Sequence, residues 1–376
     1  MARKVYILLL TFALTLLLLA GCAAGEPDVI EPYAGMQEAP PPAAPAAPGV
    51  KELAFINSGP VTDHSLNQSI HEAMDAYSRA NGMGYGVYTP VELDDDAIAA
   101  AIEQAIDGGA GLIVLNGYRF ETALFTAQDN YPYIHFILID GQSQSLQGDI
   151  FIAENTACVL FREEQAGFLA GYAAVREGYT DLGFIGGEKI PPVDRFGYGF
   201  LQGADYAAGE MGVRDITVKY AYAGTFEPDD GTRSMAAFWY DEGTEVIFAS
   251  CGGSMASVIA AAENSGGRVI ASDADLSALS QVVIASAVRD VQGAVASCLA
   301  DYYQDNFPGG RTQRLGVSDG ALSLSVSRLE KFTRSDYAGL VSALPGTRIL
   351  GDSDSGGNPY NIYDLDLKII QFVPEK

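Results

Sequence analysis

The strongest constraint on the fold is a regular alternation of short apolar runs with helix-like segments, beginning near residue 51. The apolar runs are too short for buried helices, and each is followed by a polar loop. The strand candidates are Leu53–Asn57, Gly84–Tyr88, Leu112–Asn116, Phe136–Asp140, Ile150–Ala153, Asp181–Ile185, Ile216–Ala221, Glu245–Ser250, Arg268–Ser272 and Gln281–Ala285. Strands that alternate with helices predict parallel sheets covered on both faces.

The segments between the runs carry helix signals. Gly82 ends the first of them, and Asp94-Asp95-Asp96 places acids at the positive end of the second. The helix candidates are Ser69–Asn81, Ala97–Asp107, Ala123–Asn130, Glu163–Arg176, Phe200–Met211, Gly231–Glu242 and Ser254–Asn264. The two series predict an α/β protein with two doubly wound lobes, in which ligands bind beyond the carboxyl ends of the strands.

The N-terminus predicts export. Arg3 and Lys4 precede the apolar run 5–19, and Ala20-Gly21-Cys22 resembles a lipoprotein cleavage site. We therefore expect a signal peptide at 1–21 and a lipid on Cys22, although an uncleaved signal-anchor helix is the alternative. Residues 22–50 are rich in alanine and proline, which favours an extended tether at about 3 Å per residue.

Charge and cysteine content exclude several kinds of partner. The formal net charge of −26 argues against nucleic acid and anionic lipid, so the membrane is expected to hold the chain only through its lipid anchor, on the extracytoplasmic face. Cys158, Cys251 and Cys298 show no Cys-x-x-Cys spacing, and the chain has three histidines. We expect no metal site, and buried free thiols rather than a disulfide.

Polar residues and glycines cluster directly after the predicted strands. The sets are 57–68, Asn116-Gly117-Tyr118, Asp140-Gly141, Gly186-Gly187, Arg195-Phe196, Cys251-Gly252-Gly253 and Asp273-Ala274-Asp275. The glycines and charges around Phe196 favour a loop there. Amides, carboxylates and aromatic rings together are typical of a site for a small polar ligand that contains a flat ring.

Several of these blocks, in order, resemble the basic membrane protein family of ABC-transporter substrate-binding lipoproteins, which includes purine nucleoside receptors. The blocks are Asp63-His-Ser-Leu-Asn67-Gln68, Phe161-Arg-Glu-Glu-Gln-Ala-Gly-Phe-Leu-Ala-Gly-Tyr172, Gly183-Phe-Ile-Gly-Gly187 with Ile190-Pro191, Arg195-Phe196 and Gly199-Phe200, then Val246-Ile-Phe-Ala with Gly252-Gly253, Asp273 with Asp275, Gly309-Gly310 and Asp319-Gly320. Together they cover most of residues 51–322.

The resemblance implies a two-lobed periplasmic-binding-protein fold of the first type that closes on a nucleoside. Lobe 1 would comprise 51–157 with about 284–320, and lobe 2 would comprise 158–283 with about 321–376. Crossovers are expected near 154–160, 280–286 and 318–324. The implied protein is a monomer without cofactor or catalytic activity, and its partners are an ABC permease and the permease's ATPase.

The resemblance also implies residue roles. Phe196 and Leu66 would sandwich the base, with Leu66 standing where the family has phenylalanine. The other implied contacts are Asp140 with Asn116 or Tyr118 at the polar edge of the base, Gly252, Gly253 and Asp273 at the ribose hydroxyls, and Arg289 in the place of an assisting lysine.

Two roles are predicted for residues 57–68, and they are compatible with each other. Asp63 or Ser65 is positioned to cap a helix, and Asn67 and Gln68 are expected to brace the loop. The ligand-facing residues of this stretch would then be Asn57, Ser58 and Leu66, with Asn57 or Ser58 in place of a family acid.

Other functions remain as alternatives. A sugar or a modified nucleoside would suit the same polar cleft. A nucleoside hydrolase would need several convergent acids on one metal, whereas the acids near Asp273 and Asp275 are scattered over different loops. A serine hydrolase is disfavoured because Gly-x-Ser-x-Gly is absent from the sequence. A transcription regulator would need a cytoplasmic DNA-binding head, which an export signal excludes.

Overall fold

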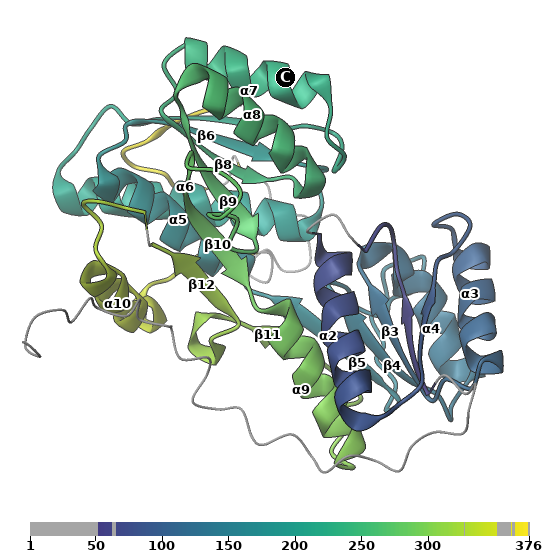
Figure 1. Ribbon diagram of the computed structural model, residues 1–376. Coiled ribbons are helices and arrows are strands. Elements are labelled where there is room, and N and C mark those ends of the chain that lie inside the picture. Colours follow the sequence, from purple (N-terminus) through teal and green to yellow (C-terminus); the bar gives the residue numbers. More distant parts are fainter. Residues whose placement is uncertain (1–51, 62–64, 327, 352–361, 363–364, 375–376) are drawn as a thin grey trace, which may run out of the picture. The chain divides into compact units, whose positions relative to one another are not determined.

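The computed structural model describes residues 52–61, 65–326, 328–351, 362 and 365–374. The predicted signal peptide, the tether, Cys22 and Asp63 lie outside these residues. Within them the chain forms two sheets, each with helices on both faces, as the sequence predicts (Figure 1).

The first sheet has six parallel strands in the order β11-β5-β4-β3-β1-β2 in the described part of the chain. These strands are β1 (Leu53–Ile56), β2 (Tyr85–Tyr88), β3 (Leu112–Asn116), β4 (His135–Ile139), β5 (Thr156–Phe161) and β11 (Arg311–Leu315).

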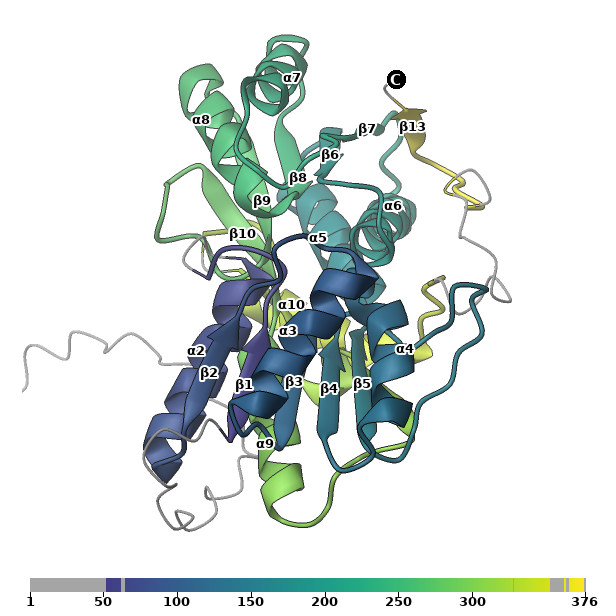
Figure 2. The ribbon, with the colours of Figure 1, turned by 90° about the vertical axis from the view of Figure 1, so that its right-hand side faces the viewer.

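Alternate residues of these strands face different helices. Leu53 and Phe55 share a buried cluster with Ile70 on α2 (Leu66–Asn81), the face that α9 (Val291–Tyr303) also covers. Ala54 and Ile56 join the cluster of α3 (Asp95–Asp107) and α4 (Glu121–Asn130) on the other face, which is turned to the viewer in Figure 2. Burial on both faces explains why the strands read as continuous apolar runs.

The second sheet has seven strands in the described part of the chain, in the order β12-β10-β9-β8-β6-β7-β13, and β12 alone among them runs antiparallel to its neighbour. These strands are β6 (Asp181–Gly186), β7 (Thr217–Tyr222), β8 (Val246–Ser250), β9 (Arg268–Asp273), β10 (Val283–Arg289), β12 (Leu322–Ser325) and β13 (Gln371–Pro374).

Two helix pairs cover this sheet. Helices α7 (Asp230–Asp241) and α8 (Met255–Ser265) lie on one face, and α5 (Glu163–Glu177) and α6 (Pro191–Met211) lie on the other (Figure 1). A further helix, α10 (Arg334–Ala343), follows β12.

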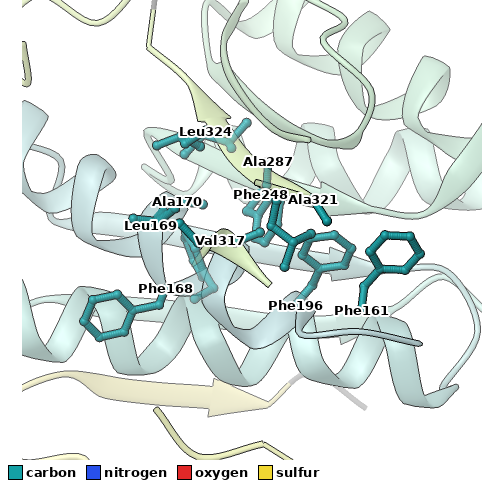
Figure 3. Close-up of a cluster of buried hydrophobic side chains, with 14 of the residues drawn as sticks. Phe161, Phe168, Leu169, Ala170, Phe196, Phe248, Ala287, Val317, Ala321 and Leu324 are labelled. Atoms are coloured by element: carbon teal, nitrogen blue, oxygen red, sulfur yellow. The ribbon is translucent and has the colours of Figure 1, made fainter. Parts of the chain in front are cut away.

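Helices α5 and α6 touch backbone to backbone through glycines. A Cβ atom on Gly199 would lie 2.0 Å from the carbonyl oxygen of Glu164, and one on Gly171 would lie 2.0 Å from that of Phe200. The predicted loop around Phe196 is wrong, because the flanking glycines lie inside α6, where Gly197 makes room for the Tyr220 side chain and Gly199 for the backbone of α5. The helix already begins at Pro191, and Figure 3 shows Phe196 within the buried cluster.

The strand predicted at Ile150–Ala153 is also wrong, because Ile150 forms only an isolated bridge and is 56% exposed. The strand that pairs with β4 is β5, and every residue of β5 is buried. The chain passes from the first sheet to the second after Phe161, returns after Arg289 and crosses again between Leu315 and Leu322. The boundary predicted between residues 157 and 158 therefore falls inside β5.

Candidate ligand-binding site

A cavity of about 620 Å³ is lined by residues of both sheets and their helices. Its walls come largely from the segments that follow the strands, which is where the sequence analysis placed the ligand. Of the predicted ligand residues, the cavity is lined by Ser58, Leu66, Asn116, Tyr118, Asp140, Phe196, Gly252, Gly253, Asp273 and Arg289. Asn57 does not line it, and its amide nitrogen donates to the carbonyl oxygen of Gly59 at 2.8 Å.

The first-sheet wall is built on the ends of two paired strands. Asn116 is the last residue of β3 and pairs in register with Ile139, so Asp140 comes next to it on the neighbouring strand. The amide nitrogen of Asn116 donates to Asn67 Oδ1 at 2.8 Å. Asn67 lies in the first turn of α2, which begins at Leu66, and Ser65 occupies its N-cap position. The predicted bracing role of Asn67 thus extends to the cavity, because Asn67 also lines it.

Arg289 pairs with three carboxylates, of which Asp140 and Asp273 line the cavity. Its Nη1 donates to Asp140 Oδ2 at 2.7 Å and to Glu163 Oε1 at 2.9 Å, and its Nε donates to Asp273 Oδ1 at 2.7 Å. Asp140 follows a first-sheet strand, whereas Asp273 and Arg289 end second-sheet strands, so the guanidinium joins the two sheets. Burial alone would lower the pKa of Arg289, but the carboxylates of Asp140, Asp273 and Glu163 outweigh it and raise that pKa above its usual value.

A second buried arginine completes the cluster. Arg195 Nε donates to Glu163 Oε2 at 2.5 Å, and the side chain of Glu163 is fully buried between the two arginines. Burial raises the pKa of Glu163, whereas Arg195 and Arg289 oppose this rise. The sequence analysis placed Arg195 in the cleft but gave neither it nor Glu163 a role in this ion cluster.

Phe196 lies beneath the same guanidinium. The centre of its ring is 5.8 Å from Arg289 Cζ and 5.8 Å from the ring of Phe248, and the side chain is 1% exposed. A ring buried to this extent belongs to the core of the second lobe as well as to the cavity wall. Leu66, its predicted partner across the base, is partly buried against the main core cluster.

Phe226 is an aromatic wall residue that the sequence analysis missed. It lies four positions beyond β7, outside the stretch that immediately follows the strand. Ser254 holds its loop, because the Ser254 hydroxyl donates to the carbonyl oxygens of Thr225 at 3.3 Å and Glu227 at 2.5 Å. A Cβ on Gly253 would lie 2.9 Å from the carbonyl oxygen of Phe226, which explains the need for glycine there.

Glu188 connects the second-sheet wall with the first. It follows Gly186-Gly187 at the end of β6, and its carboxylate accepts from the hydroxyl of Tyr118 at 3.5 Å. Arg119 Nη2 lies 3.7 Å from the same carboxylate. Both ion-pair side chains are more than a third exposed, so this contact is weaker than the buried cluster around Arg289.

The thiols take no visible part in the site. Cys158, Cys251 and Cys298 are free and buried, which confirms the expectation of unpaired thiols. Burial raises the pKa of Cys158 to about 12, so this thiol is far from the ionised form that reacts.

Comparison with known proteins shows which family this chain resembles. Residues 50–338 match the family model described as "Bmp: ABC transporter substrate-binding protein PnrA-like". Basic membrane protein B of Borreliella burgdorferi is 31% identical over 292 residues, which cover 73% of this chain and 80% of that protein.

Solved structures show the same fold. A solute-binding protein of an ABC transporter system from Aeropyrum pernix K1 matches with a TM-score of 0.66 at 23% identity, covering 82% of this chain and 89% of that one. The Lac repressor matches with a TM-score of 0.54 at 14% identity, over 74% of this chain and 82% of the repressor chain. The architecture is thus that of type I periplasmic binding proteins and of regulators like the Lac repressor.

Proposed function

Because this chain belongs to the Bmp family of PnrA-like substrate-binding proteins of ABC transporters, we propose that the solute it binds is a purine nucleoside. The family is one of binding proteins rather than enzymes. In this proposal the nucleoside lies in the cavity between the two sheets, and a permease with its ATPase receives it.

The observation that carries the proposal is the composition of the cavity walls. A volume of about 620 Å³ lies in the usual range for small-molecule sites. Leu66 offers an apolar face and Phe226 an aromatic face for a flat base, whereas Asn116, Asp140 and Asp273 offer acceptors for N–H and O–H groups. A base joined to a polyol has both kinds of surface.

Binding in this cavity would couple to closure of the lobes. A ligand that contacts Asn116 on the first sheet and Gly252 on the second interacts best when the two walls are close, so it favours the closed state. The closed form then presents both lobes to the permease in one arrangement. No covalent bond is made or broken in this cycle.

The proposal includes a lipid anchor at Cys22 on the extracytoplasmic face of the cell membrane. The sequence of the cleavage site supports it, and the relatives are named basic membrane proteins. Among the described residues, no helix has the length and apolar character that a membrane crossing requires. Labelling of growing cells with a clickable fatty acid tests the anchor, since Cys22→Ser should abolish incorporation and Cys298→Ser should not.

Isothermal titration of the purified protein with purine and pyrimidine nucleosides and with free ribose tests the ligand. We expect saturable binding of at least one purine nucleoside and no measurable binding of ribose. Phe226→Ala should weaken this binding by about 1–3 kcal/mol if the ring stacks on the base. Phe238→Ala, which alters an exposed ring on α7 away from the cavity, serves as the control. Failure of every nucleoside to bind would refute the proposed ligand.

A further inference from the structure

The hydrogen bonds of the first-sheet wall fix the direction of two side-chain amides. Asn67 Oδ1 accepts the backbone N–H of Ser58 at 3.2 Å, and because a backbone N–H can only donate, the Asn67 atom at this point must be the oxygen. Asn116 meets this oxygen at 2.8 Å and must therefore present its nitrogen. The carbonyl oxygen of the Asn116 amide is consequently directed to the other side.

Two buried acceptors in the cavity wall are left without donors by this arrangement. Asn116 Oδ1 and Asp140 Oδ1 accept no hydrogen bond from any residue that the structure describes, although the two residues are 4% and 7% exposed and both line the cavity. The other carboxylate oxygen of Asp140 is already taken by Arg289. A buried acceptor without a donor is costly, so the wall is built for a ligand that brings N–H or O–H groups.

Two neighbouring residues add to the excess of hydrogen-bond acceptors in this part of the wall. The hydroxyl of Ser58 donates to Asn67 Oδ1 at 3.3 Å, and in this arrangement its lone pairs add further acceptors to the wall. Arg289 donates four of its five N–H groups to Asp140, Glu163 and Asp273, so at most one remains for a ligand. Acceptors therefore predominate in the part of the wall formed by Ser58, Asn116 and Asp140.

The two residues that carry these acceptors lie at the ends of neighbouring strands. Asn116 ends β3 and Asp140 follows β4, and adjacent strands are about 5 Å apart. A ligand edge with neighbouring donors can satisfy both at once. Guanosine has such an edge in its N1–H and its exocyclic amino group, whereas ring N1 of adenosine is an acceptor.

Resting on the nucleoside function proposed above, we propose that this wall selects purine nucleosides with adjacent N–H donors, of the guanosine type, over adenosine. Asn116 and Asp140 are the specificity-determining residues. Asn67 is a positioning residue that holds the Asn116 amide with its oxygen towards the ligand. Adenosine places its N1 lone pair against these oxygens and leaves at least one of them unpaired.

Titration of the purified full-length protein with guanosine, inosine and adenosine tests the selection. We expect guanosine to bind about 10- to 100-fold more tightly than adenosine, with inosine between them because it lacks the 2-amino donor. Purine binding with adenosine equal to or tighter than guanosine would overturn this inference and leave the proposed function standing. Absence of binding by all three would overturn both.

Variants test the positioning role separately. Asn67→Ala frees the Asn116 amide to turn, so the ratio of the adenosine to the guanosine dissociation constant should fall at least about fivefold. Asn81→Ala, which removes a buried amide from the same helix far from the cavity, should leave the ratio unchanged. If Asn67→Ala does not fold, Asn116→Leu must lower the ratio by removing the acceptor itself. An unchanged ratio in a folded Asn67→Ala protein would overturn the positioning role, and an unchanged ratio in Asn116→Leu would overturn the selection by Asn116.

Discussion

Replacement of Arg289 by methionine should destabilise the protein strongly, because it removes the cation shared by three carboxylates. The side chains of Asp140 and Glu163 are 6% and 0% exposed, and Asp140 would lose the single cation that pairs with it among the described residues. Breaking a buried ion pair from one side costs about 3–5 kcal/mol. We expect a loss of that size in the free energy of unfolding. Arg289→Lys should lose less, since an ammonium retains the charge but not the planar arrangement of donors.

Urea unfolding at pH 7 measures this loss. The chain has one tryptophan, Trp239, which is 1% exposed on α7 of the second lobe and gives a local fluorescence signal. Arg233→Met is the matched control, because Arg233 and Asp230 form an ion pair whose side chains are 53% and 89% exposed, and exposed pairs contribute about 0–1 kcal/mol. If Arg289→Met lowers the free energy of unfolding no more than Arg233→Met does, the buried ion cluster around Arg289 does not stabilise the fold as its geometry indicates.

The pH dependence of the Arg289→Met loss gives an independent check. Burial already raises the pKa of Glu163, and removal of Arg289 would raise it further. Between the unfolded and folded pKa values of Glu163 the native state binds more protons, so stability decreases as pH rises through this window. The loss in the variant should therefore be largest at neutral pH and shrink on acidification. A loss that is constant from pH 7 to pH 4 would contradict this reasoning.

Two further predictions concern packing and protonation. Gly199→Ala should lower the free energy of unfolding by about 1–3 kcal/mol or more, because its Cβ would lie 2.0 Å from the Glu164 carbonyl oxygen. In the same urea assay Gly339→Ala, in an open position of α10, should be neutral or stabilising by about 0.5–1 kcal/mol. Equal effects would contradict direct backbone contact between α5 and α6. Burial lowers the pKa of His135, so the unfolded state binds more protons and stability should fall as pH decreases below about 6.5. Thermal unfolding between pH 7 and pH 5 should therefore give a flatter pH dependence for His135→Phe than for the wild type, and parallel curves would refute the role of His135.

Much of the fold could be predicted from the sequence because strands buried on both faces have an unambiguous pattern. Leu112–Asn116 is observed as predicted, and most other strands differ by a few residues. The mistaken strand Ile150–Ala153 has the right composition, but Ile150 and Phe151 are exposed, and a short apolar run does not reveal its own burial. The neighbouring run Thr156–Phe161 is the strand because it pairs with both β4 and β11, and β11 is remote in sequence.

The sequence indicated which residues line the cavity where they directly follow strands, but it did not indicate partners that are set by tertiary contacts. Asn116, Asp140 and Asp273 meet at the cavity because parallel strands end at the same edge of a sheet. The pairing of Arg289 with Glu163 depends on a crossover between lobes, which local sequence does not encode. The loop predicted around Phe196 was wrong for a related reason, since glycines that serve helix contact look like loop glycines until the partner helix is known.

Residues 368–374 cover the edge of β7 in the second sheet. Asp205 Oδ1 accepts the backbone N–H groups of Lys368, Ile369 and Ile370 at 3.0, 2.7 and 3.1 Å, which leads β13 into parallel pairing along β7. An uncovered β7 would present a row of free amide and carbonyl groups, which is a template for intermolecular pairing and aggregation. Proteolysis that removes residues 368–374 would therefore expose an edge that favours self-association, even though the ligand cavity would keep all of its lining residues.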